Sequence, residues 1–180
     1  SISPTPTPLP PATAPIPVWL IRFRNDPRVY ALLGDKKIKW IPSIDVFNAL
    51  SLNWSSIKVL PASLRASYQR ASLLRVENDT RVYYITETGL KRHIPTVEVF
   101  LSYGNRWQDV AIVKDFELNA IPDNVLIRQV DDSKVYKLEN GTKRWVMTAD
   151  AFNRLGLNWN QIAPVNAVEM NYYTEGVQIN

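Results

Sequence analysis

The chain has 180 residues and a mass of 20.6 kDa, enough for one domain or for a few small units that share a core. No cysteine and a single histidine exclude disulfides, cysteine nucleophiles, thiolate metal sites and sites with several histidines. The net charge of +4 comes without a block of like charges, which argues against nucleic acid as a partner. No apolar run approaches the roughly 20 residues that a membrane-spanning helix needs.

Residues 1–17 differ in composition from the rest of the chain. They hold seven of the thirteen prolines and no charged residue. Alternating proline and threonine favours extended polyproline II and disfavours a helix or a central strand. We therefore predict an extended tail or stalk of the kind found on secreted and surface proteins. Its larger apolar side chains, Leu9 and Ile16, can pack against a neighbouring subunit.

The remainder of the sequence is an internal repeat. Tyr30, Tyr83 and Tyr136 follow one another at intervals of 53 residues, and Trp54, Trp107 and Trp159 at intervals of 53 and 52. Matches this dense over three copies indicate a duplicated structural unit. The copies cover residues 18–70, 71–123 and 124–175, and residues 176–180 read as the first strand of an unfinished fourth copy.

Each copy predicts three strands followed by a short helix. Two turn signals, an Asn-Asp or Asp-Asp pair and then a glycine-containing turn, separate three runs of β-branched and aromatic residues. Ser43, Thr96 and Thr148 then stand where a helix N-cap belongs, each followed two residues later by a carboxylate. The sequence thus predicts an α+β fold, mostly β. It consists of three tandem β-β-β-α repeats in a compact pseudo-threefold arrangement, with an extended tail.

The repeated pattern V-Y-x-[IL]-x-x-x-G-x-K-R-[WH]-[IV], then Phe and Trp at helical spacing, resembles repeats of secreted and surface proteins of bacteria. Residues 82–94 with Phe100 and Trp107 carry it most fully, as do residues 135–146 with Phe152 and Trp159. The resemblance covers nearly everything after residue 17. It implies an extracellular or cell-surface location and a non-catalytic role, and it supplies no site residues.

Little in the sequence favours an enzyme. His93 is the obvious general base, but tryptophans occupy its place in the other copies, so a packing role is favoured. Asp45, Glu98 and Asp150 recur once per copy at a helix start, where the backbone explains them. The chain lacks nucleophile-elbow, P-loop and dinucleotide-binding motifs. We therefore predict no catalytic residue, no metal site and no cofactor.

Tryptophans are the strongest candidates for binding. Trp54, Trp107 and Trp159 either fill identical core slots or form aromatic platforms for sugar rings. A second set consists of aromatic and cationic residues in the third predicted strand of each copy. These residues could bind anionic glycans, or they could simply pair with residues of the neighbouring strand. That set comprises Trp40 and Trp145 with Lys39, Arg92 and Arg144.

Two functions stay open at this level. The first is a structural or surface-assembly subunit that polymerises through its tail and exposed strand edges, with Leu9, Ile16, Val177 and Ile179 as contacts. The alternative is a trivalent carbohydrate- or cell-wall-binding module on a stalk. The predicted partners are accordingly further copies of the chain or glycans of the cell envelope.

Overall fold

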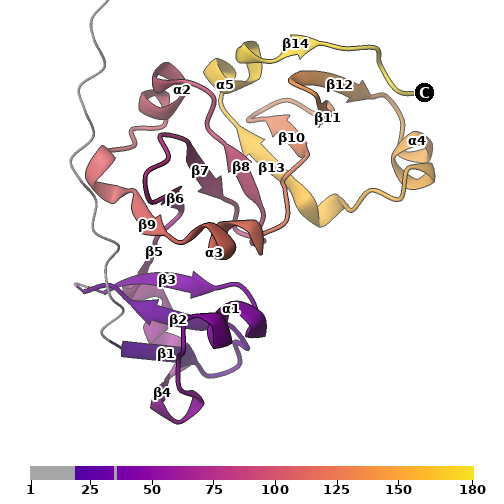
Figure 1. Cartoon of the computed structure of the whole chain (residues 1–180). Coiled ribbons are helices and arrows are strands. Elements are labelled where there is room, and N and C mark those ends of the chain that lie inside the picture. The colour runs from indigo at the N-terminus through magenta and orange to yellow at the C-terminus, as the bar shows by residue number, and fades with distance from the viewer. Residues whose placement is uncertain (1–18, 35) are drawn as a thin grey trace, which may run out of the picture.

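The computed structural model describes residues 19–34 and 36–180, so Leu9 and Ile16 lie outside the described residues. Three separate β-sheets follow one another along the chain, each accompanied by short helices (Figure 1). The predicted α+β, mostly β class is confirmed. In the described part of the chain, no helix is both long and apolar enough to cross a membrane.

The first sheet has the strand order β4-β1-β2-β3-β5. Its three central strands form antiparallel hairpins, and the outer strands β4 and β5 join them in parallel. The helix α1 and the 3-10 helices η1 and η2 complete this first unit. The bounds are β1 Trp19–Phe23, β2 Val29–Leu32, β3 Lys37–Ile41, α1 Ile44–Ala49, η1 Trp54–Ser56, β4 Ile57–Leu60, η2 Ala62–Ser67 and β5 Gln69–Arg70.

The second sheet has the order β8-β7-β6-β9, the same central arrangement with one parallel outer strand. A single bridge between Lys91 and Asp123 stands where the other parallel strand would be. The bounds in this second unit are β6 Leu73–Val76, β7 Val82–Ile85, β8 Lys91–His93, α2 Val97–Ser102, η3 Trp107–Asp109, β9 Ala111–Val113 and α3 Asp115–Asn119.

The third sheet returns to five strands in the order β13-β10-β11-β12-β14. Its pairing directions match those of the first sheet. The bounds in this third unit are β10 Leu126–Gln129, β11 Val135–Glu139, β12 Thr142–Val146, α4 Ala149–Arg154, η4 Trp159–Gln161, β13 Ile162–Val165, α5 Ala167–Tyr172 and β14 Thr174–Glu175.

The helix that follows each third strand begins as the sequence predicts. The hydroxyls of Ser43, Thr96 and Thr148 accept hydrogen bonds from backbone N–H groups three residues on, at 3.1, 3.2 and 3.0 Å. These contacts satisfy amides that have no partner within the helix. The helices α2 and α4 end where Gly104 and Gly156 adopt φ of +68° and +64°, the left-handed region that glycine enters at little cost.

Each sheet is buried on both faces. One face packs against α1, α2 or α4, whose Phe47, Phe100 and Phe152 are almost completely buried. The other face packs against η2, α3 or α5. The sequence does not predict this second layer, because helices of five or six residues are too short to display an apolar period. Burial on both faces explains how such small sheets hold together.

The C-terminal residues differ from the prediction of an unpaired strand. Backbone hydrogen bonds join Ile179 N to Trp145 O and Met147 N to Ile179 O, at 2.8 and 3.0 Å. Ile179 also packs against the core around Phe152, whereas the side chain of Val177 is exposed. Residues 176–180 therefore extend the edge of the third sheet beside β12. The backbone of Ile179 is not available as an open edge for assembly.

Replacing Phe100 by Ala should destabilise the protein by about 3–5 kcal/mol, because a buried phenyl ring leaves a cavity. Leu101→Ala, in the same helix but exposed, should change the free energy of unfolding by less than about 0.5 kcal/mol. Chemical denaturation of both variants measures the difference. Equal destabilisation by the two would contradict the described core.

Candidate functional site

The tryptophans that begin η1, η3 and η4 are neither fully buried nor fully exposed. Trp54, Trp107 and Trp159 are 53%, 41% and 51% exposed. Each indole is stacked on the buried phenylalanine of its own unit, with ring centroids 4.0, 4.0 and 3.8 Å apart. One ring face is thus held against the core while much of the ring meets solvent. The observed position combines features of both alternatives, a core slot and an aromatic platform.

Two clefts contain the rings of Trp107 and Trp159 and are built from corresponding positions of the second and third units. The cleft of the second unit holds about 320 Å³ and the cleft of the third about 190 Å³. Their linings correspond residue by residue along the repeat. The pairs are Thr80 and Ser133, Arg81 and Lys134, Val82 and Val135, His93 and Trp145, Ile94 and Val146, Thr96 and Thr148, Phe100 and Phe152, and Trp107 and Trp159.

The cation differs between the two clefts. In the second unit, Arg81 donates to Asp79 through Nε and Nη2, at 2.9 and 2.6 Å. These hydrogen bonds lower the pKa of Asp79 to about 2 and neutralise the pair. In the third unit, the Lys134 ammonium lies 4.6 Å from the centroid of the Trp145 ring, a cation–π contact. The Lys134 ammonium thus faces the indole, while the neighbouring carboxylate of Asp132 accepts from the backbone N–H of Lys134.

His93 lines the second cleft beside its strand partner. Its ring centroid lies 5.5 Å from that of Tyr83, and the two planes are tilted. Partial burial lowers the pKa of the imidazole, and the charge of Arg81 lowers it further. The ring is therefore neutral at pH 7, when it can accept or donate one hydrogen bond to a ligand.

Trp40 occupies the corresponding strand position of the first unit but makes different contacts. Its ring packs against the core of the second unit. A Cβ placed on Gly89 would lie 3.0 Å from this ring, so the glycine turn of the second unit accommodates the indole. Trp40 therefore contributes to the contact between units, whereas Trp145 lines a cleft.

The predicted cationic patch of Lys39, Arg92 and Arg144 is not a free surface. Lys39 forms an ion pair with Glu117, and Arg92 donates from Nε to Glu169 Oε1 at 2.6 Å. All four side chains of these two pairs are at most 8% exposed. The correction has a physical reason, because each cation reaches a carboxylate of the following unit, and burial requires such a partner.

Arg144, at the same position of the third unit, stays within its own unit. It donates from Nε to the carbonyl of Val177 and from Nη1 to Glu139 Oε2, both at 2.7 Å. It thus helps to hold residues 176–180 beside β12. No glycan role is supported for this residue by its contacts.

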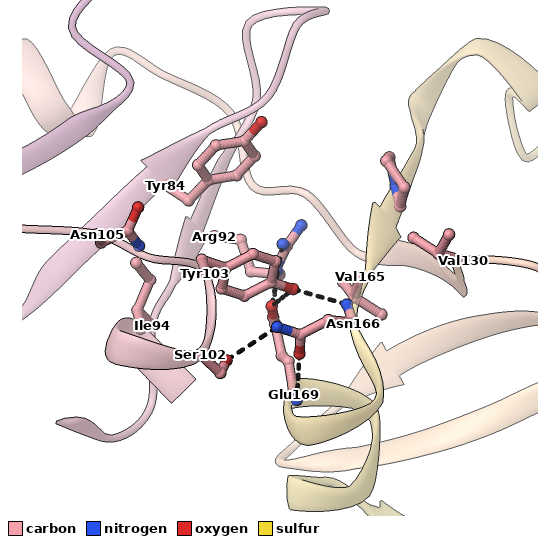
Figure 2. A pocket seen from close by; sticks show the side chains of 11 residues that line it. Tyr84, Arg92, Ile94, Ser102, Tyr103, Asn105, Val130, Val165, Asn166 and Glu169 are labelled. Carbon is pink, nitrogen blue, oxygen red and sulfur yellow. Dashed lines mark hydrogen bonds and ion pairs between the residues drawn. The ribbon is translucent and has the colours of Figure 1, made fainter. Parts of the chain in front are cut away.

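A larger groove lies where the second unit meets the third (Figure 2). It holds about 570 Å³ and has the Arg92–Glu169 pair among its lining residues. The hydroxyl of Tyr103 donates to Glu169 Oε2 at 2.6 Å and accepts from the backbone N–H of Asn166 at 2.9 Å. Burial and the neighbouring carboxylate raise the pKa of Tyr103 well above its usual value. The phenol therefore stays protonated and holds the two units together.

Sequence reasoning missed Glu117, Glu169 and Tyr103. One signal was available, because Glu117 and Glu169 lie 52 residues apart, close to the 53-residue interval between Tyr30, Tyr83 and Tyr136. A buried acid at a repeated position indicates a repeated partner. Each partner lies 77 or 78 residues away along the chain. At such a separation, the spacing of residues in the sequence does not show which side chains are in contact.

No protein family, no curated protein and no solved structure matches this chain. Within residues 19–34 and 36–180, no group of three or more His, Asp or Glu side chains is arranged to hold a metal ion. The features available for chemistry are thus the tryptophan clefts and the groove.

The single histidine makes the second cleft easy to follow by NMR. We expect His93 to titrate below the ordinary value of about 6.5, so the folded state binds its proton less readily than the unfolded chain. His93 should accordingly lower the free energy of unfolding as the pH falls through that window. Arg81→Gln should raise the pKa of His93. Lys134→Gln, the matching change in the third unit, should leave it unaltered, and an equal response to both would contradict this assignment.

Glu169→Gln should destabilise the protein by about 3–5 kcal/mol, since Arg92 would keep its buried charge without a counter-charge. Glu77→Gln breaks the exposed pair with Lys114 and should cost less than about 1 kcal/mol. Thermal unfolding followed by circular dichroism compares the two. If both variants melt like the original protein, the junction is not a buried ionic contact.

Proposed function

We propose that the protein is a non-catalytic, secreted or cell-surface glycan-binding protein. The observation that carries the proposal is the half-exposed tryptophan of each unit, stacked at about 4 Å on a buried phenylalanine. An exposed aromatic ring that the core holds rigidly loses little entropy when a ligand packs on it. Sugar rings present flat C–H faces that suit such a platform.

The clefts around Trp107 and Trp159 supply polar contacts of the kind that a sugar needs. In the second unit, the hydroxyls of Thr80 and Thr96 and the imidazole of His93 lie around the ring of Trp107. An apolar surface with a few hydrogen-bonding groups is the usual composition of a small-molecule site. The third cleft replaces the imidazole by Trp145 and adds the charge of Lys134, which suits anionic residues of cell-envelope glycans.

We further propose that the three units are tandem copies of one ancestral unit. The matching strand orders, N-caps and clefts support this proposal. Both junctions use a cation of the third strand and a glutamate in the next unit, so successive units are related by a similar step. A pseudo-threefold arrangement requires the same geometric relation between each unit and the next. Equivalent clefts on one body would bind a repeating polymer with avidity.

A surface-assembly subunit is our second proposal. The uncharged, proline-rich composition of residues 1–17 favours it, since such a segment loses little conformational entropy on docking. The groove between the second and third units also favours it, because this surface shares only Ile94 with the cleft of Trp107 and no lining residue with the cleft of Trp159.

Trp107→Ala and Trp159→Ala test the glycan proposal. Each change should weaken binding to its preferred glycan about tenfold or more, as loss of an aromatic anchor does, and the double variant should lose avidity altogether. The readouts are a glycan array, co-sedimentation with insoluble cell-wall polysaccharide, and calorimetry on the hits. Trp19→Ala is the matched control, because Trp19 is 61% exposed and lies in the first unit.

Melting curves establish that each variant remains folded. A folded original protein that binds no glycan on the array or the wall polymer would overturn the proposal. Binding by the double variant as strong as that of the Trp19→Ala control would do the same.

A further inference from the structure

The groove between the second and third units is a departure from the repeat. Both junctions share the buried cation–glutamate pair, but the side chains around it differ. Ala31 is the strand partner of Lys39, whereas Tyr84 is the partner of Arg92. Leu50 ends the helix at the first junction, whereas Tyr103 ends it at the second. In a repeated framework, residues that break the pattern at one place mark a function found only there.

The charges in this groove are already neutralised. Arg92 donates to both carboxylate oxygens of Glu169 and to Asn124 Oδ1, and its guanidinium stands 5.4 Å from the centroid of the Tyr84 ring. Glu169 also accepts from the hydroxyls of Tyr103 and Tyr173. A ligand with a net charge would find no free counter-charge in these groups.

The groups that remain are aromatic faces, apolar walls and two hydrogen-bonding side chains. Figure 2 shows Tyr84 and Tyr103 on the side of the second unit, with Val130 and Val165 across the groove. Among the described residues, neither the hydroxyl of Tyr84 nor the amide of Asn105 makes a hydrogen bond. Both can donate to a carbonyl oxygen. The groove thus fits an uncharged, largely apolar, extended chain with unpaired carbonyl groups.

We propose that this groove binds an extended proline-rich peptide, and that its occupant is the segment 1–17 of a second copy of the chain. Aromatic-lined grooves recognise polyproline II because proline rings pack on tyrosines while donors meet the backbone carbonyls. The segment carries seven prolines and no charge, so it matches the neutral groove. The inference rests on the assembly proposal and is independent of the tryptophan clefts.

A second copy is the favoured source because of where the segment joins the body. It precedes Trp19 of β1, in the first unit (Figure 1). The groove, in contrast, is lined by residues of the second and third units. Seventeen residues of polyproline II span about 53 Å at roughly 3.1 Å per residue. Proline-rich sequences favour extended conformations, so reaching the groove of a neighbour requires less bending than reaching back over the second unit of the same chain. Each docked segment would join the first unit of one copy to the groove of another, an open head-to-tail contact.

Light scattering of the full chain over a range of concentrations tests this inference. The mass should rise above the 20.6 kDa of one copy, and an excess of a synthetic peptide of residues 1–17 should return it to one copy. Val130→Trp should weaken the association at least tenfold by filling the groove, since Val130 is 54% exposed and lines it. Val59→Trp, on an exposed strand position of the first unit, is the matched control.

A mass of one copy at all concentrations would overturn the inference. So would an association that neither Val130→Trp nor the peptide weakens, or one that Val59→Trp weakens equally. Glycan binding measured on the same variants keeps the two proposals apart. Val130→Trp should leave it unchanged, and Trp107→Ala should leave the association unchanged.

Discussion

The arrangement of the three units depends on two buried ion pairs between residues far apart in the sequence. Lys39 reaches Glu117, and Arg92 reaches Glu169, each across a boundary between sheets. Buried pairs of this kind contribute little net stability, because desolvation offsets their attraction. Their effect lies in specificity, since a mispositioned unit would leave a charge buried without a partner. Apolar contacts hold each unit together and, through Trp40, also join the first unit to the second; we infer that the ion pairs select which surfaces meet.

The groove between the second and third units follows from this contact. Arg92 of β8 and Glu169 of α5 fix the distance between these two elements, so the space beside them keeps its shape without a ligand. Tyr103 bridges both units by donating to Glu169 and accepting from Asn166. A preformed cavity of this kind costs little reorganisation when it is filled.

Local features of the fold were predictable from the sequence, and contacts between units were not. The hydroxyls at Ser43, Thr96 and Thr148 predicted the helix starts because capping acts over three residues. Turn residues with positive φ, such as Asn78 at +63°, were predictable for the same local reason. The burial of Lys39 and Arg92 was not predictable, since lysine and arginine in a strand usually face solvent and their partners lie in short helices. The positions of the tryptophans were predicted only in part. A ring with one face on the core and much of its area in solvent fits both alternatives, a core slot and an aromatic platform.

One position in the second layer of short helices, formed by η2, α3 and α5, has consequences for the order in which the units can follow one another. The third residue of that layer's short helix is Leu64 in the first unit, Glu117 in the second and Glu169 in the third. Only the second unit therefore carries both halves of a junction, an acid toward the preceding unit and Arg92 toward the following one. Duplicating it in place would lengthen the protein with every buried charge matched. A copy of the first unit in the middle of the chain would instead set Leu64 against a buried cation.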